Sequence, residues 1–205
     1  MRKFTLLAVS CALFFFAGAA FAQQVDVFIG GGTLISSTGT DPNTLNPPER
    51  GGLYLNLGGD VVIHQRVGFN VETAWRATQG TYGVNTGLNY RPILTDFNLL
   101  YQPRLGKKAG VDLLAGIGAG DTRLYAQGIN GLSSGGYANY VSADHFMEHL
   151  GVGIRYYVWK HVFVRPEFHY YHIQSNTNPI QNGFFSSDNV FRAGASVGYT
   201  FGGGD

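Results

Sequence analysis

The chain has 205 residues, of which 44% are hydrophobic, 14% aromatic and only 13% charged, and it contains 30 glycines. An average soluble domain carries about 25% charged residues and about 7% glycine, so this chain has few charges for a surface in water. The formal net charge of +1 excludes a basic field for nucleic acid, and the many Phe, Tyr, Val, Leu and Ile residues exclude intrinsic disorder. After residue 22 no apolar run reaches the roughly 18 residues of a membrane-spanning helix, which leaves a Gly- and aromatic-rich β protein.

The first 22 residues are typical of a secretory signal peptide. Arg2 and Lys3 precede an apolar stretch, and Ala20-Phe21-Ala22 supplies the small-x-small pattern of a cleavage site. We therefore expect a cleaved signal peptide over residues 1–22 and a barrel domain over residues 23–205; a short N-terminal membrane anchor is the alternative. Cys11 is the only cysteine and falls in the discarded segment, so the mature chain has no disulfide and no thiol chemistry.

Apolar and polar residues alternate with a period of two in eight later segments, which predicts β-strands whose two faces meet different surroundings. These segments are Gln24–Leu34, Gly52–Ile63, Val67–Thr78, Asn89–Pro103, Ala109–Leu124, Ala143–Trp159, His161–Gln174 and Asn189–Phe201. Each is long enough for a tilted membrane-spanning strand, which needs about 9–11 residues.

The connections between these segments alternate strictly between short and long. The short ones are His64–Arg66, Arg104–Lys108 and Trp159–Lys160, and the long ones are Ile35–Gly51, Gln79–Leu88, Tyr125–Ser142 and Ser175–Asp188. This alternation predicts an all-β fold, an eight-stranded antiparallel up-and-down transmembrane β-barrel. Outer-membrane barrels place their short turns in the periplasm, so we expect a periplasmic N-terminus.

Each predicted strand has one apolar and one polar face. In Val67–Thr78, for example, Phe69 and Val71 alternate with Asn70 and Glu72. In a soluble lipocalin-like carrier the apolar face would point inward, whereas in a membrane barrel it would meet lipid.

The distribution of charge favours the membrane arrangement. A sheet surface in water normally carries many Lys and Glu residues, but after the leader the only lysines are Lys107, Lys108 and Lys160, all in short turns. An eight-stranded barrel is just wide enough inside to be filled by side chains, and an uncompensated buried charge costs several kcal/mol. We therefore expect an interior ion-pair network of Glu72, Arg76, Asp96, Asp112, Arg155, Arg165, Glu167 and Arg192 that closes a polar core. A conduction or binding role for these residues is the alternative.

Aromatic residues on the apolar faces predict two girdles at the membrane interfaces, where such rings anchor. Trp75, Phe168 and Phe191 lie near long-loop ends, and Tyr101, Tyr156, Tyr199 and Phe201 lie near short-turn ends. Ordinary aromatic core packing is the alternative. Glu148 is an exception on the lipid-facing side, which places it above the bilayer or at a bulge.

The leader, the eight amphipathic segments and the final pattern Phe191…Val197-Gly198-Tyr199-Thr200-Phe201 together resemble the small outer-membrane β-barrel proteins of diderm bacteria, the OmpA/OmpX/OmpW-like group. The resemblance covers nearly the whole mature chain as a pattern. It implies an integral outer-membrane location, contact with outer-membrane lipids and lipopolysaccharide, and recognition of Tyr199 and Phe201 by the barrel-assembly machinery. The chain departs from the family by extending past Phe201 through Gly202–Asp205. The OmpW-like branch implies a narrow conduit for small hydrophobic molecules.

The segment from His172 to Asn176 resembles the His-x-Ser-Asn motif of outer-membrane lipid A deacylases. In those enzymes His and Ser are two residues apart, so both project from one strand face and the imidazole takes the hydroxyl proton. Here His172 and Ser175 are three apart, which sends them to opposite faces of a regular strand. They are weak catalytic candidates, and we expect no enzymatic activity and no cofactor.

The histidines and the glycine run do not predict a ligand site. His145 and His149 share a strand face but lie about 13 Å apart at about 3.3 Å per residue, and His64 and His161 lie in or near short turns. Gly30-Gly31-Gly32 is not a phosphate loop, because no helix-forming segment follows it.

The long connections are the expected functional surfaces. Residues 125–142 combine Tyr125, Tyr137 and Tyr140 with Gly, Ser and Asn, a composition suited to adaptable contacts, although a plain solvated loop is the alternative. We expect an external ligand at residues 125–142 and 175–188, no nucleic-acid partner, and a role in envelope integrity or surface interaction.

Overall fold

The computed structural model describes residues 24–36, 51–64, 66–82, 88–126, 140–174 and 189–202. Over these residues the chain forms strands β1 (Gln24–Ser36), β2 (Tyr54–His64), β3 (Val67–Arg76), β4 (Gly80–Tyr82), β5 (Leu88–Tyr101), β6 (Ala109–Ala126), β7 (Tyr140–Tyr157), β8 (Val162–Ile173) and β9 (Asn189–Gly202). In the described part of the chain, no helix is long and apolar enough to cross a membrane.

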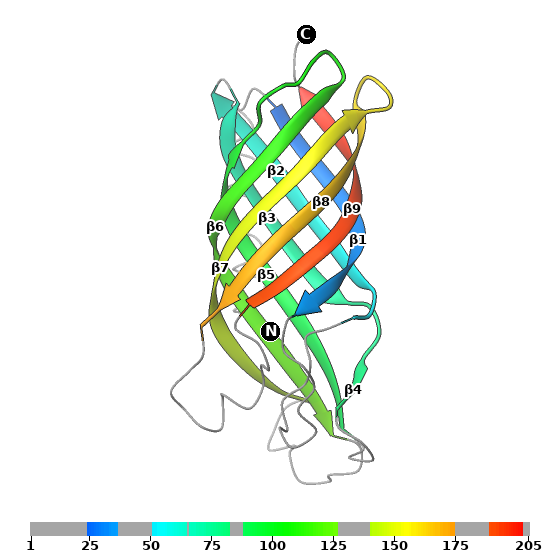
Figure 1. Ribbon diagram of the computed structural model, residues 1–205, viewed down its shortest axis with the longest axis vertical. Helices are drawn as coiled ribbons and strands as arrows, with labels where there is room; N and C mark the ends of the chain where they lie inside the picture. Colours follow the sequence, from blue (N-terminus) through cyan, green and yellow to red (C-terminus); the bar gives the residue numbers. More distant parts are fainter. Residues whose placement is uncertain are drawn as a thin grey trace, which may run out of the picture.

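The long strands close into one barrel (Figure 1). Each pairs antiparallel with its neighbours in the chain, β1 pairs with β9, and β3 pairs with β5, so the sheet closes on itself. The short strand β4 adds only to β5, at the long-loop rim drawn at the bottom of Figure 1. Closure leaves no unpaired sheet edge among the eight long strands. The prediction of an eight-stranded antiparallel barrel is confirmed.

Two details of the long-loop rim differ from the sequence-based expectation. Residues 79–88 are not entirely loop, because Gly80–Tyr82 pairs with β5. Tyr125 and Tyr140, expected in a loop, are cross-strand partners at the ends of β6 and β7, with ring centroids 5.6 Å apart. Aromatic cross-strand pairs stabilise a sheet, which explains why these strands continue past the predicted ends.

The two faces of the barrel wall have the polarity of a membrane protein. Ile29, Leu57 and Phe97 point outward with 59%, 55% and 53% of their surface exposed, whereas Arg155 and Arg165 are buried inside the barrel at 1%. The alternative of a soluble carrier with an apolar interior is therefore wrong.

Glu148 lies on the outward face, as its parity predicts, and is exposed between two apolar outward neighbours of β7. Its cross-strand partners are Ile117 and His172. The register of β6 with β7 runs without interruption through this position, so of the two alternatives for Glu148 the bulge is wrong. Among the described residues, the pairing of β2 with β3 shifts register between Val62 and His64.

Small residues make room for the large side chains in the lumen. A Cβ atom added to Gly198 would lie 2.2 Å from Phe163 Cζ. The Phe163 ring is fully buried and lies 4.1 Å from Arg155 Cζ, centroid to atom. Glycine on one strand therefore allows an aromatic ring and a guanidinium group from other strands to fill the lumen.

Candidate functional site

The centre of the lumen is organised around Arg155 of β7. Its Nη2 donates to Asp60 Oδ2 at 2.7 Å and to Asp112 Oδ2 at 2.9 Å, and its Nη1 donates to Asp26. Asp26 and Asp60 are cross-strand partners on β1 and β2, and Asp112 lies on β6, so one guanidinium group connects two parts of the wall.

Arg165 of β8 extends the same cluster. Its Nη1 lies 3.3 Å from Asp60 Oδ2 and 3.1 Å from Asp112 Oδ2, and its Nε donates to Glu167 Oε2 at 3.0 Å. Asp60 and Asp112 therefore each accept from two arginines. This sharing satisfies buried charges that would otherwise be costly to hold away from water.

Arg192 of β9 forms the layer nearer the long-loop rim. Its Nη2 pairs with Glu72 and lies 3.2 Å from Glu167 Oε1. Asn56 Nδ2 donates to the same two carboxylates, at 3.0 Å each. Ser196 Oγ donates to Glu167 Oε2 at 3.1 Å.

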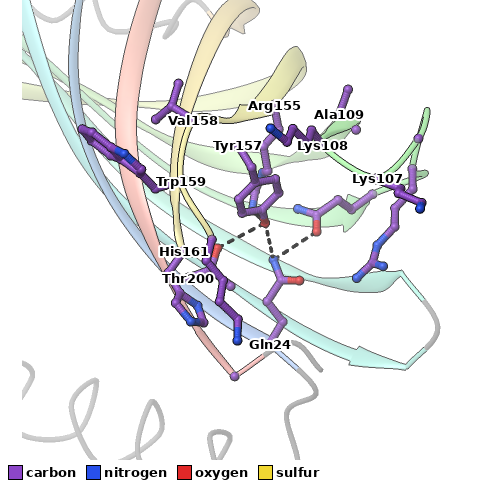
Figure 2. Close-up of a pocket in the computed structure, with 16 residues that line it drawn as sticks. Gln24, Lys107, Lys108, Ala109, Arg155, Tyr157, Val158, Trp159, His161 and Thr200 are labelled. Atoms are coloured by element: carbon purple, nitrogen blue, oxygen red, sulfur yellow. Dashed lines mark hydrogen bonds between the residues drawn. The ribbon is translucent and has the colours of Figure 1, made fainter. Parts of the chain in front are cut away.

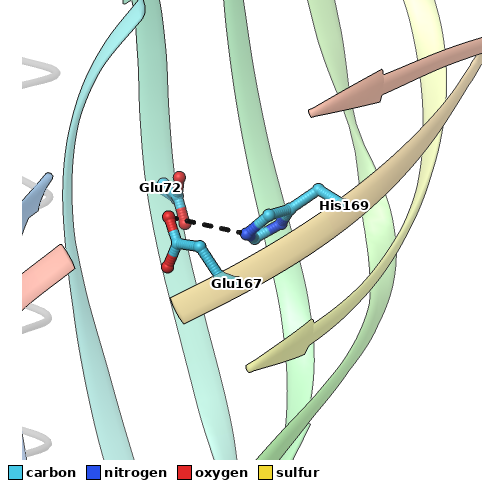
Figure 3. A group of neighbouring side chains, drawn as sticks. All are labelled: Glu72, Glu167 and His169. Atoms are coloured by element: carbon cyan, nitrogen blue, oxygen red, sulfur yellow. Dashed lines mark ion pairs between the residues drawn. The ribbon is translucent and has the colours of Figure 1, made fainter. Parts of the chain in front are cut away.

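Glu72, Glu167 and His169 have the spacing of a metal-binding group, with one potential ligand atom of each within 4.8 Å of the others (Figure 3). His169 Nε2 lies 3.7 Å from Glu167 Oε1. The same Glu167 oxygen, however, already accepts from Asn56 and Arg192. A resident guanidinium charge on both carboxylates opposes a second cation there, so we assign this group to the ion-pair network.

Asp96 is buried and forms no ion pair with an arginine of the described residues. It accepts from Asn98 Nδ2 at 2.5 Å and lies 3.5 Å from His149 Nδ1. His149 Nε2 in turn contacts His169 Nδ1 at 2.9 Å. The histidines thus join Asp96 to Glu167 through a chain of polar contacts.

Arg76 is the expected network residue that the structure places elsewhere. It lies at the long-loop end of β3, only partly buried, with its Cζ 5.0 Å from the centroid of the Tyr90 ring. Among the described residues it makes no ion pair. Arg76 lies on the inward-facing side of β3, as expected. Its position at the long-loop rim, however, separates it from the carboxylates of the ion-pair network.

Sequence reasoning missed the two carboxylates at the centre of the network, Asp26 and Asp60, both fully buried. It also missed the amides of Asn56, Asn70 and Asn98 that connect the carboxylates. In β1, Asp26 alternates with valines that point outward, and this alternation could have predicted that Asp26 faces the lumen.

The lumen is closed on both sides of the network. Toward the long-loop rim lies a buried apolar cluster of Leu34, Tyr54, Leu94, Met147, Tyr171, Ile173 and Val190. Toward the short-turn rim, Gln24 Nε2 donates to Asp26 Oδ2 at 2.8 Å and to Gln102 Oε1 at 3.2 Å, and Gln102 Nε2 donates to Asp112 Oδ1 at 3.0 Å. Beyond this amide layer a cavity of about 540 Å³ opens at the short-turn rim (Figure 2).

The other expected site residues lie on the outer face or beyond the described residues. His172 points outward, and its Nδ1 lies 3.2 Å from Asn189 Oδ1, while Ser175 is outside the described residues. The expected girdle residues all point outward. Tyr101, Tyr156, Phe168, Tyr199 and Phe201 are between 43% and 52% exposed. Trp75 and Phe191 are half-buried.

The expected ligand-binding loops are also largely beyond the described residues. Of residues 125–142, the structure describes only the strand ends 125–126 and 140–142, and residues 175–188 lie entirely outside the described part of the chain.

The model of the family described as "Outer membrane protein beta-barrel domain" matches residues 7–202. No curated protein sequence matches the chain significantly.

Solved structures of small barrels match the fold. Ail, the attachment invasion locus protein of Yersinia pestis in complex with the heparin analogue sucrose octasulfate, has a TM-score of 0.54 at 13% identity, covering 87% of this chain and 98% of that one. Neisserial surface protein A has a TM-score of 0.59 at 11% identity, covering 87% and 96%. The N-terminal β-barrel domain of Pseudomonas aeruginosa OprF has a TM-score of 0.53 at 12% identity, covering 88% and 98%. With the family model matching almost the full chain, this protein belongs to the outer membrane protein beta-barrel domain family and is integral to the outer membrane.

Proposed function

We propose that this protein is a closed, non-enzymatic barrel that contributes to envelope integrity or surface interaction by holding its long connecting segments at the outer face. The observation that carries this proposal is the filled lumen. Arg155 and Arg165 are each 1% exposed and join carboxylates from different parts of the wall. The ion pairs lie between a buried apolar cluster and an amide layer, which supports a lumen filled by side chains and a barrel that acts as a scaffold.

The orientation of the scaffold follows the rule for outer-membrane barrels, which keep short turns in the periplasm and long loops outside. The connections over residues 37–50, 127–139 and 175–188 then belong to the outer face. The leader over residues 1–22 would direct export, and Tyr199 and Phe201 would present the outward aromatic pattern of the last strand to the barrel-assembly machinery.

A conductance measurement tests the closed lumen. The refolded protein should give no stepwise current in a planar bilayer at moderate salt, because ions cannot pass buried ion pairs without breaking them. A known porin in the same bilayer is the positive control. Steady single-channel steps from this protein would instead support the conduit for small molecules.

A cellular test separates integrity from surface interaction. Cells lacking the protein should be more permeable to large antibiotics, and a form lacking residues 128–137 should restore the permeability barrier. The same form should lose adhesion to immobilised heparin, a probe suggested by the heparin analogue in the solved Ail complex. If adhesion survives this deletion, residues 128–137 do not mediate the surface interaction. Heat-modifiable gel migration reports whether the deleted form still folds.

A lipid A deacylation assay tests the non-enzymatic part of the proposal. We expect refolded protein to leave lipid A acyl chains intact. Loss of acyl chains that depended on His172 would overturn this expectation, and a His172→Gln variant supplies the comparison.

A further inference from the structure

The cavity at the short-turn rim has an unusual concentration of positive charge. It is lined by Arg104, Lys107, Lys108 and Lys160. All three lysines that follow the leader are among its lining residues, and none of the described Asp and Glu residues is. In a chain with so few charges, this places most of the positive charge of the short turns around one hollow.

The basic side chains come from two turns on opposite sides of the cavity. Figure 2 shows Lys107 and Lys108, from the β5–β6 turn, on one side and Trp159 and His161, from the β7–β8 turn, on the other. Lys160 lies between Trp159 and His161 in the sequence and also lines the cavity, so a group that enters between the two turns would meet cations from both.

Backbone hydrogen bonds hold these turns in place. Leu105 N donates to Ala109 O at 2.8 Å and closes the β5–β6 turn, and Tyr157 N donates to Lys108 O at 2.8 Å. On the other side, Thr200 N donates to His161 O at 2.8 Å. The backbone that carries the basic residues is thus fixed before any ligand arrives, which reduces the entropy lost on binding.

The floor of the cavity includes the amides of Gln24 and Gln102 and reaches Arg155, the central arginine of the ion-pair network. Tyr157 Oη lies 3.2 Å from Thr200 Oγ1 and 3.5 Å from Gln24 Nε2. Beneath this layer, Asp26 and Asp112 are occupied by Arg155 and by the amides of Gln24 and Gln102. Asp26 and Asp112 each contact the Arg155 guanidinium group and do not line the cavity themselves, while the lysines at the rim are exposed.

We propose that this cavity binds phosphate-bearing anions at the periplasmic mouth of the barrel. Several cations around one cavity favour a multiply charged group, and lysine is a common phosphate ligand that acts as a point charge. The volume of about 540 Å³ lies in the range of about 300–1,000 Å³ typical of small-molecule sites. The phosphate is carried either by a soluble periplasmic anion or by a lipid headgroup of the inner leaflet.

Calorimetry with sodium tripolyphosphate tests the soluble source. The full mature chain is refolded into nanodiscs of phosphatidylcholine, a lipid without net charge, and titrated at low salt. We expect saturable binding that Lys107→Gln/Lys108→Gln/Lys160→Gln weakens by about tenfold or more, because three cations are lost. Raising the salt should weaken binding to the unsubstituted protein as the charges are screened.

Arg66→Gln is the matched control. Arg66 carries the same charge, is exposed and lies in the β2–β3 turn of the same rim, but it does not line the cavity. This variant should keep the affinity of the unsubstituted protein within about twofold. Each single Lys→Gln variant replaces the triple variant if heat-modifiable migration shows that the triple variant does not fold.

Native mass spectrometry from discs that also contain phosphatidylglycerol tests the lipid source. Retained phosphatidylglycerol that is lost in the triple variant assigns the site to a lipid headgroup, and tripolyphosphate binding in phosphatidylcholine discs assigns it to a soluble anion. The proposal is overturned if the unsubstituted protein binds neither probe, or if Arg66→Gln weakens binding as much as the triple variant does. The outcomes of these binding experiments do not depend on whether the lumen conducts ions. The proposed scaffold role is therefore tested separately, by the conductance measurement.

Discussion

At the scale of single residues, Arg155 is the side chain on which most of the buried charge depends. It contacts Asp26, Asp60 and Asp112, whereas Arg165 reaches only the latter two of these carboxylates. Asp26 therefore has no second arginine among the described ion pairs. Its remaining hydrogen-bond donor is the amide of Gln24.

Replacing Arg155 by Leu should destabilise the barrel strongly. The substitution leaves buried carboxylates without their cation, and breaking a buried pair in this way typically costs about 3–5 kcal/mol. The free energy of unfolding is measured in urea for protein refolded into vesicles. Arg123→Gln is the control, because the Arg123–Asp121 pair is partly exposed, at 35% and 20%, and such surface pairs contribute about 0–1 kcal/mol. Equal effects of the two substitutions would contradict the central place of Arg155.

The sequence predicts that the lumen is polar more readily than it predicts which residues form the ion-pair network. Arg155, Arg165 and Arg192 stand out because each alternates with apolar neighbours in its strand. Asp60 follows two glycines and precedes two valines, so no alternation marks its face. Which carboxylate meets which arginine depends on the register between strands, and a single sequence does not contain that register.

At the scale of the strand, β6 shows how close the wall approaches itself. Gly116 and Gly118 face inward on β6. A Cβ atom on Gly116 would lie 2.1 Å from the carbonyl oxygen of Phe97, on the neighbouring strand β5. Because that neighbour is backbone, it cannot move aside without disturbing the strand pairing.

Gly116→Ala should therefore lower the free energy of unfolding by about 1–3 kcal/mol, the usual cost of overpacking. Gly106→Ala is the matched control, since Gly106 lies in the β5–β6 turn and an added Cβ meets nothing within 4 Å. Urea unfolding followed by gel mobility compares the two variants. The close approach would be disproved if both variants unfolded at the urea concentration of the unsubstituted protein.

Strand interiors were predictable here, and strand ends at the long-loop rim were not. The central parts of β5 and β6 alternate clearly, because one face meets lipid and the other the lumen. At the rim both faces approach water, so the alternation fades and composition becomes loop-like around Tyr125 and Tyr140. Their pairing across β6 and β7 is a long-range contact that local composition does not encode.

At the scale of the whole molecule, the barrel has an apolar exterior and a charged interior. This arrangement is stable only in a membrane, because lipid accepts the outward side chains and ion pairs satisfy the inward ones. Ile29 tests the arrangement, since it lies in the middle of the outward row of β1 and is 59% exposed.

Ile29→Arg should destabilise the barrel by about 2–4 kcal/mol, the cost of a basic residue facing the bilayer midplane. Leu105→Arg places the same charge in the β5–β6 turn, where Leu105 is 67% exposed, and it should leave the stability nearly unchanged. Unfolding of both variants from lipid vesicles gives the comparison. If Ile29→Arg were as stable as the turn variant, the outward face would not be meeting hydrocarbon.

The position of Arg192 links assembly to electrostatics. Arg192 lies on the last strand, and its partners Glu72 and Glu167 lie on β3 and β8. Until β9 joins β1, Glu72 lacks its cation and Glu167 has only Arg165, so a partly assembled wall carries excess negative charge. Pairing of β9 with β1 therefore completes the hydrogen bonding of the sheet and supplies the countercharge of Arg192 in one event. An intermediate in which β9 is still unpaired lacks both.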